Sequence, residues 1–229
     1  MCLILVAWRR DARFPLVVAA NRDEFHARRS AAAAFWRDDA QVLAGRDLEG
    51  MGTWLGVTRG GRFAAVTNYR GGRDPNALES RGLLTTRFLQ DGAAPRDYMG
   101  ELAARGASYS GFNLLAADGD ELWWYSNRDG APRRLESGIY GLGNDLLDSA
   151  DVEPAKQRLA ESLAPAPAIE PLFAALAPAR IVNGPYGTRC STAVVAGTDG
   201  RWRFAERAFD AAGLELATVH FDFAAVASG

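Results

Sequence analysis

Cysteine and histidine are scarce in this sequence. The 229 residues include two cysteines, Cys2 and Cys190, and two histidines, His26 and His220. Two cysteines cannot form the multi-bridge scaffold of a small secreted protein. The two histidines lie far apart in sequence and do not have the spacing of a multi-histidine zinc site. We therefore expect no metal at the functional site.

Lysine is almost absent, because Lys156 is the one lysine among 26 basic residues. The arginines that take its place are spread along the chain, which is typical of a compositional bias and not of a cluster that binds phosphates or carboxylates. The net charge of -2 provides no electrostatic attraction to nucleic acid or to an anionic membrane. We therefore expect no nucleic-acid partner.

Long apolar runs and a secretory leader are also lacking. The apolar run after Met1 is too short to cross a bilayer. Arg9 and Arg10 follow this run, whereas a signal peptide has its positive charges first. The sequence therefore predicts a cytoplasmic protein without a membrane span. Its length and its 48% of hydrophobic residues suit a single domain over residues 1–229, of unknown oligomeric state.

Short apolar segments separated by turn residues predict a fold rich in strands. Two hairpins are expected first, followed by helices, a strand meander, further helices and closing strands. Tight turns between successive strands indicate antiparallel pairing, so the order predicts an α+β fold of sheets packed on one another and covered by helices. The alanine-rich stretch 26–36 is compatible with a helix or an ordered loop. The expected elements are hairpin strands 3–8, 14–20, 53–57 and 62–69, helices 80–92, 95–106, 153–164 and 171–177, and strands 112–118, 121–127, 138–144, 191–197, 201–207 and 214–223.

Cys2 directly follows the initiator methionine. After removal of Met1, its thiol and its own α-amine have reference pKa values of about 8.5 and about 7.7–8.0. One residue would then supply a nucleophile and a proton acceptor. The alternative is a buried structural cysteine on the first strand, where cysteine is common. Position alone favours this alternative.

The run Asn21–Glu24, with sequence NRDE, follows the second predicted strand. If the first two strands pair as a hairpin, this run returns beside Cys2. Arg22, with a carboxylate from Asp23 or Glu24, would there shift the pKa of the thiol, orient its amine or clamp a substrate. The alternative is a charged strand end at the surface. Asn21 and Glu24 are predicted to contact the substrate.

Two asparagines end strand-like segments. Asn68 in TNY and Asn144 in GLGND can each direct an amide N–H at a reacting carbonyl as an oxyanion donor, or can form an ordinary turn. Tyr69 follows Asn68. Trp54 is one of six tryptophans expected in the core and the pocket wall. Tyr69 and Trp54 are predicted to contact the substrate.

Arg189 enters an otherwise apolar strand within the segment YGTRCST. A guanidinium beside a core strand needs a partner, and Asp23, Glu24, a carbonyl or a ligand would serve. Cys190 is expected to point to the opposite face of the strand from Arg189, so it is not a candidate nucleophile.

Together these segments resemble the NRDE family, also called the Transport and Golgi organization protein 2 family. The resemblance implies an N-terminal-nucleophile hydrolase type of fold with a four-layer αββα sandwich. The chain departs from the family pattern at HARRSAAAA, where a Pro-Thr-like stretch is usual, and at SADVEPAK, where Trp-Pro-Lys is usual. The matching pieces occur in the family's order, from residue 1 to about residue 192: MCLILVAW, ANRDEF, LAGRD with GTWLG, RFAAVTNYRG, SRGLL, GFNLL, GLGND and YGTRCST.

A more distant likeness to cysteine amidohydrolases, such as penicillin V acylase and bile salt hydrolases, implies roles for the candidate residues. It implies hydrolysis of a non-peptide C–N amide bond of a small molecule, with no cofactor required. The implied catalytic residues are Cys2 as nucleophile, Arg22 with Asp23 or Glu24 near its amine, Asn68 and Asn144 at the oxyanion, and Arg189 as the late arginine of the site.

A second hypothesis is a binding protein. Some members of the family are implicated in haem trafficking, so the resemblance implies that haem is the alternative ligand of the same cleft, without turnover. His26, His220, Cys2 or a methionine would then supply an axial ligand, and one such ligand is sufficient. A third hypothesis is a scaffold that has lost catalysis and binds another small molecule.

Overall fold

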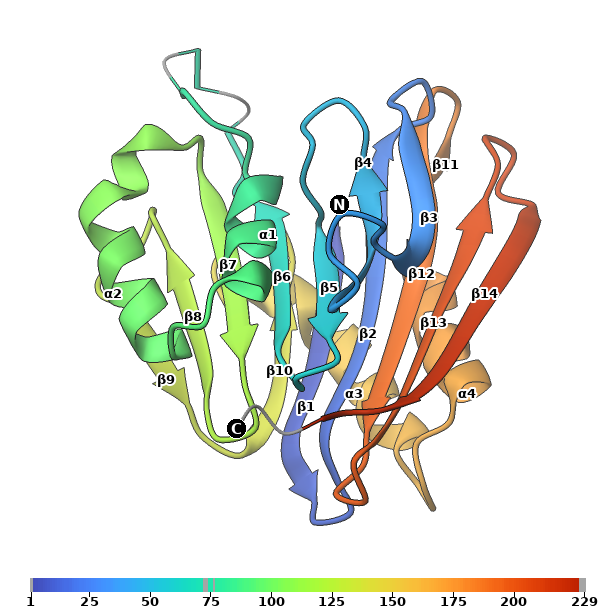
Figure 1. Ribbon diagram of the computed structural model, residues 1–229. Coiled ribbons are helices and arrows are strands. Elements are labelled where there is room, and N and C mark those ends of the chain that lie inside the picture. The colour runs from blue at the N-terminus through green and yellow to red at the C-terminus, as the bar shows by residue number, and fades with distance from the viewer. Residues whose placement is uncertain (1, 72–73, 76, 227–229) are drawn as a thin grey trace. The chain divides into compact units, whose positions relative to one another are not determined.

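A computed structural model of the chain describes residues 2–71, 74–75 and 77–226 (Figure 1). The chain divides into two compact units, which are described in turn. Unit 1 comprises Met1–Arg28, Ser137–Gly143 and Leu147–Ala225, and unit 2 comprises Arg29–Glu136, Asn144–Leu146 and Val226–Gly229. The expectation of a single domain over residues 1–229 stays a prediction.

Unit 1 is built on an antiparallel sheet with the strand order β10-β1-β2-β12-β13-β14, and β11 pairs with β12. The expected first hairpin is present, because Leu3 pairs with Asn21 and Trp8 with Leu16. It is longer than the apolar run predicted, since β2 continues through the whole NRDEF segment. The strands are β1 (Leu3–Asp11), β2 (Phe14–Phe25), β10 (Gly138–Leu142), β11 (Val182–Asn183), β12 (Tyr186–Ala196), β13 (Arg201–Phe209) and β14 (Glu215–Ala224).

Two helices cover one face of this sheet. Both were expected from the sequence: α3 (Glu153–Ser162), which has proline in its first turn, and α4 (Ile169–Leu176). Short 3-10 turns precede α3 and follow α4, at Ala150–Val152 and Ala177–Ala179. The core between helices and sheet is formed by apolar side chains of α3, α4, β1, β2, β12 and β13, among them Leu5, Leu159, Leu172 and Leu176.

Unit 2 is built on a second antiparallel sheet, ordered from β3 to β9 as in the sequence. Helices α1 (Gly82–Gln90) and α2 (Pro95–Arg105) pack on it and share a core with it, and a 3-10 turn, Gly106–Ser108, follows α2. The strands are β3 (Ser30–Phe35), β4 (Val42–Asp47), β5 (Leu55–Thr58), β6 (Phe63–Asn68), β7 (Phe112–Ala117), β8 (Leu122–Ser126) and β9 (Arg133–Leu135).

The predicted α+β class with mostly antiparallel sheets is confirmed, and each unit contains one sheet and one pair of α-helices. The expectation for residues 26–36 is wrong, since Ser30–Phe35 forms strand β3 paired with β4. Alanine favours helices, but its propensity is a weak prior, and here sheet pairing overrides it. Within the described part of the chain, every helix is too short or too polar to cross a membrane.

Candidate active site

Cys2 lies immediately before β1, opposite the NRDE segment of β2. The backbone N–H of Asp23 donates a hydrogen bond to Sγ of Cys2 at 3.4 Å, and the thiol lies 3.4 Å from the carbonyl oxygen of Asp23, to which it can donate. The hairpin register explains this contact, because Leu3 pairs with Asn21 and the residues just beyond must meet. The sulfur is thus held by polar backbone groups, and Cys2 as a whole is partly exposed.

The Asp23 carboxylate faces β12. The hydroxyl of Thr188 donates to Oδ1 of Asp23 at 2.6 Å and accepts a hydrogen bond from the backbone N–H of Ile181 at 2.8 Å. Asp23 and Thr188 are both buried. Buried polar groups are stable when they are hydrogen-bonded in this way, so the pair fixes the backbone segment that contacts Cys2.

Charge and burial act in opposite directions on the Cys2 thiol. Burial raises its pKa, and the negative charge of Asp23 raises it further. The hydrogen bond from the Asp23 backbone and the positive charge of Arg22 lower it, but the net pKa stays above the ordinary value. The thiol is therefore protonated at neutral pH and needs a base to become a strong nucleophile.

Arg22 is buried on β2, and Cys190 of β12 pairs with it in the sheet. The Cys190 thiol is buried and lies 3.4 Å from Oε2 of Glu206, which accepts its hydrogen bond. Burial and the charge of Glu206 raise the pKa of Cys190 well above the ordinary value, while Arg22 lowers it. The burial and the raised pKa of Cys190 are typical of a core thiol, and its orientation relative to Arg189 stays a prediction.

Arg189 stands at an irregularity in the pairing of β12 with β2. Thr188 pairs with Asp23 and Cys190 with Arg22, so Arg189 is the extra residue of a bulge. Its Nη1 donates to the carbonyl oxygens of Phe25, His26 and Arg28 at 3.0, 3.2 and 2.9 Å. These contacts hold the chain that follows β2. A catalytic role for Arg189 stays a prediction.

Asn21 and Glu24, the other two residues of the NRDE segment, contact groups other than Cys2. The amide of Asn21 donates to the carbonyl of Leu176 at 3.2 Å and accepts from the Ser191 hydroxyl at 2.7 Å, which gives Asn21 a structural role. Glu24 accepts from its neighbour's N–H and forms an ion pair of 3.7 Å with Arg28. Among the two acidic residues, Asp23 is therefore the one that contacts Cys2. Substrate contacts by Asn21 and Glu24 stay predictions.

Unit 2 brings the two candidate oxyanion asparagines together. Nδ2 of Asn144 donates to the backbone carbonyl of Asn68 at 2.6 Å, and the N–H of Arg70 donates to the Asn144 carbonyl at 2.7 Å. Arg70 also pairs with Asp145 at 2.6 Å, and the buried Asn113 donates to the Asp145 carbonyl at 2.9 Å. The segment Asn144–Leu146 is thereby bound at the ends of β6 and β7.

The remaining predicted residues are placed as follows. Asn68 is exposed, and Tyr69 and Trp54 of unit 2 are half-buried, with the Tyr69 N–H bonded to the carbonyl of Gly111. His26 is partly buried beside Gly187, and His220 is exposed on β14.

Comparison with known proteins identifies the family. The sequence model of the family described as Transport and Golgi organisation 2 matches residues 1–180. This chain belongs to that family. It is 35% identical to the Transport and Golgi organization protein 2 homolog of Bos taurus and 32% identical to that of Homo sapiens, and each match covers 90% of this chain and 92% of the relative. The Drosophila melanogaster protein is 29% identical over 59% of this chain and 54% of its own length.

A solved structure has a fold similar to that of this chain. The N-acylethanolamine-hydrolyzing acid amidase ortholog of Caenorhabditis elegans is similar with a TM-score of 0.54 and 13% identity, covering 85% of this chain and 92% of that one. This likeness shows a fold shared with that amidase and confirms the predicted fold class.

Sequence reasoning missed two side chains of the site in this family member. The Tyr186 hydroxyl lies 3.4 Å from the Asp23 carbonyl oxygen, which the Cys2 thiol also contacts, and burial together with the charges of Cys2 and Asp23 raises the pKa of Tyr186. Thr188 holds the Asp23 carboxylate. Both belong to the YGTRCST segment, from which Arg189 was the predicted site residue.

Proposed function

We propose that this protein hydrolyses a non-peptide C–N amide bond of a small molecule, with Cys2 as the nucleophile after removal of Met1. The observation that carries the proposal is the Cys2 thiol bound to both backbone groups of Asp23, beside the buried charge of Arg22. A structural cysteine on a strand needs no such polar surroundings. The amidase-like fold is compatible with this chemistry but does not supply the substrate.

The first step requires a base, because the thiol pKa is raised. The α-amine that Cys2 gains when Met1 leaves has a reference pKa of about 7.7–8.0 and is attached to the same residue. We propose that this α-amine accepts the proton of the Cys2 thiol. Sγ then attacks the carbonyl carbon of the amide, and the carbonyl oxygen takes the negative charge.

Neutral amide donors suit that oxyanion. Asn68 and Asn144 stay the predicted donors, and the hydrogen bond from Asn144 to the Asn68 carbonyl keeps the Asn144 amide in one orientation. The tetrahedral intermediate collapses when the ammonium of Cys2 returns the proton to the departing nitrogen. A free amine leaves and a thioester remains, which water hydrolyses to the carboxylic acid and the regenerated thiol.

A matched pair of variants tests the proposal. Native protein is incubated with a panel of fluorogenic N-acyl amides, and we expect release of the amine for at least one of them. Cys2→Ser is expected to lose this turnover, whereas Cys190→Ser removes the other thiol of the chain and is expected to keep it. Full activity of Cys2→Ser would refute Cys2 as the nucleophile. Absence of turnover across the panel, with a substrate still bound, would favour a scaffold that only binds.

Haem binding stays a prediction, and no contact among the described residues favours it. A haem titration followed at the Soret band tests it directly. A spectral shift that disappears in His26→Ala or His220→Ala would support a ligated haem, and an unchanged spectrum would exclude one.

A further inference from the structure

β14 is an edge strand of the unit 1 sheet, and its residues are exposed or half-buried. β14 ends the strand order, and in the described part of the chain no strand pairs with its far side (Figure 1). Natural proteins usually protect such an edge with lysine, proline, a bulge or a covering segment. Residues 215–224, with sequence ELATVHFDFA, contain neither lysine nor proline, and the shift in their pairing with β13 lies between Glu215 and Thr218. This edge is therefore suited to pairing with another strand.

The hairpin register determines which backbone groups face outward. The N–H of Ala225 donates to the carbonyl of Gly200 at 2.8 Å, and the pairing continues without a shift from Arg201 opposite Ala224 to Arg207 opposite Thr218. Hydrogen-bonded and non-hydrogen-bonded pairs alternate in an antiparallel ladder. The outward N–H and C=O groups are therefore those of Thr218, His220, Asp222 and Ala224.

The side chains along this edge are complementary to a second copy of the same strand, because an imidazole N–H of His220 can donate to the carboxylate of Asp222. In an antiparallel pairing about Phe221, His220 lies opposite Asp222 of the second copy, and the two-fold axis repeats that pair. Both residues are exposed and both have outward backbone groups. Thr218 lies opposite Ala224 in the same ladder, so the register brings no like charges together among these positions.

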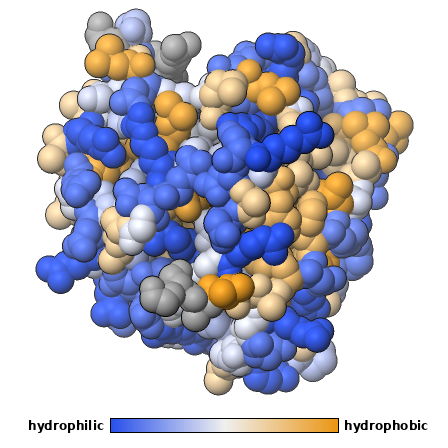
Figure 2. Space-filling view, in the orientation of Figure 1, coloured by the Kyte–Doolittle hydropathy of each residue, from blue (hydrophilic) through white to orange (hydrophobic). Residues whose placement is uncertain are grey.

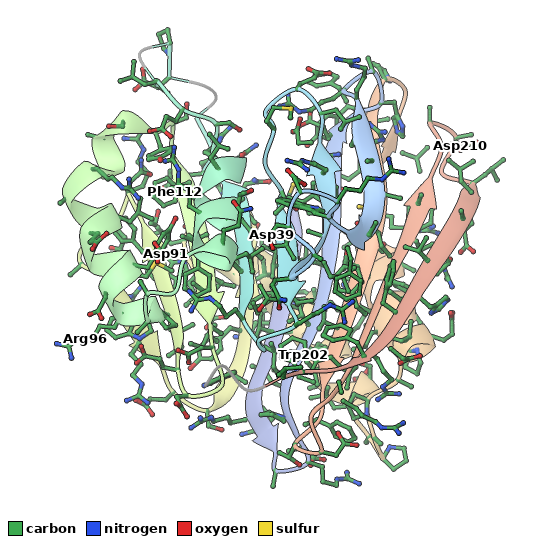
Figure 3. The ribbon with its side chains drawn as sticks, viewed as in Figure 1. Asp39, Asp91, Arg96, Phe112, Trp202 and Asp210 are labelled. Atoms are coloured by element: carbon green, nitrogen blue, oxygen red, sulfur yellow. The ribbon has the colours of Figure 1, made fainter. Side chains whose placement is uncertain are left out.

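The other face of β14 carries apolar side chains that continue toward the same edge. Val219, Phe221 and Phe223 are half-buried. The Phe223 ring stacks on Trp202 of β13 at a centroid distance of 6.2 Å, and Phe221 makes an edge contact with Phe204 at 6.3 Å. Figure 2 shows apolar atoms gathered over β13 and β14, and Figure 3 labels Trp202 on β13 and Asp210 at the turn between the two strands.

We propose that two copies of this chain associate through β14, which pairs antiparallel with β14 of the second copy about Phe221. The association joins the two unit 1 sheets into one continuous sheet. On one face it buries Phe221 against its symmetry mate and Val219 against Phe223. On the opposite face it forms two His220–Asp222 contacts. Pairing of two identical edges is isologous and closes after two chains.

Sedimentation velocity over a concentration series tests the association. Native protein is expected to sediment as a concentration-dependent dimer. His220→Asp places like charges opposite each other twice, and the dissociation constant is expected to rise about tenfold or more. The swap His220→Asp with Asp222→His keeps the composition and is expected to restore the dimer. A monomeric native protein, or dimers unaffected by His220→Asp, would refute the interface. Failure of the swap to restore them would refute the register.

A cross-linking experiment tests the register independently. In the Cys2→Ser background, Phe221→Cys places two thiols in a non-hydrogen-bonded pair with Cα atoms about 4.5 Å apart, within the range of a disulfide. Oxidation is expected to give a covalent dimer. Ala217→Cys is the matched control, because its two copies lie roughly 25 Å apart in this register. Cross-linking of Ala217→Cys but not of Phe221→Cys would overturn the proposal.

Discussion

The end of the unit 1 sheet at Cys2 and the end of the unit 2 sheet at Asn68 are built from different chemistry. At Cys2, the surrounding groups are buried and charged, and the pKa values of Cys2 and Tyr186 are raised. At Asn68, the candidate donors are neutral amides near the surface, and hydrogen bonds of 2.6 and 2.7 Å join Asn144 to Asn68 and to Arg70. The roles proposed for the two ends differ accordingly: proton transfer at Cys2, and stabilisation of a negative charge by the two asparagines.

The Cys2 end and the Asn68 end are also held in place by different kinds of contact. Asp23 is held by Thr188 and by the pairing of β2 with its neighbours, which come from distant parts of the chain. Asn144 belongs to the segment Asn144–Leu146, which is part of unit 2 although the residues before and after it in the chain belong to unit 1. Changes at the Cys2 end should therefore alter thiol chemistry, and changes at the asparagine end should alter turnover alone.

The largest expected effect is the loss of the nucleophile. Cys2→Ala is predicted to lower turnover of any amide substrate by about three orders of magnitude or more, because every covalent step passes through Sγ. Steady-state release of the amine is the measurement. If Cys2→Ala retains a tenth of native turnover, Cys2 is not the nucleophile.

The asparagine end is predicted to give a smaller kinetic effect. Asn144→Ala removes one oxyanion donor, and kcat is expected to fall by about 10²–10³ with little change in the thiol's reactivity toward iodoacetamide. Asn183→Ala on β11 is the matched control and is expected to keep native kcat. An Asn144→Ala protein that turns over normally would assign this end a structural role.

Arg189 is predicted to contribute to stability. Arg189→Met removes the hydrogen bonds to three carbonyls and should lower the free energy of unfolding by about 2 kcal/mol. Arg203→Met is the matched control, since Arg203 donates to the carbonyl of Pro167 alone at 2.9 Å, and a smaller loss is expected. Urea titrations compare the two variants, and equal losses would contradict the bridging role.

The smallest expected effect is on the thiol pKa. The charge of Asp23 raises the pKa of Cys2 and that of Arg22 lowers it. Asp23→Asn should therefore move the pH profile of Cys2 alkylation to lower pH, and Arg22→Gln should move it to higher pH. Because the folded-state pKa is raised, the Cys2 contribution to stability is present below the ordinary thiol pKa and is lost as the pH rises through the raised value. Shifts in the same direction for both variants would contradict the charge assignment.

The sequence was sufficient to predict the hairpin that brings NRDE back to Cys2, because two apolar runs flank one charged turn. It left the choice between Asp23 and Glu24 open, since that choice depends on the backbone of Asp23 and on the ion pair of Glu24 with Arg28. Tyr186 and Thr188 were not predicted as site residues, because their positions depend on the pairing of β12 with β2. These two strands are separated by more than half the length of the chain.

The edge strand β14 was predicted as a strand, but its exposed position was not. Strand order in a sheet depends on long-range pairing, which alternating hydrophobicity does not encode. The alanine-rich β3 was missed for a related reason, because its strand conformation comes from pairing with β4 and not from local preference.

The proposed mechanism requires that Cys2 is the N-terminal residue of the working protein. Intact-mass spectrometry of the purified protein, expressed without an N-terminal tag, measures this. The proposed mechanism predicts a mass lower than that of the full chain by one methionine residue, because the base is the α-amine of Cys2. A mass that retains Met1 throughout the sample would contradict the mechanism, since that amine would then be locked in a peptide bond.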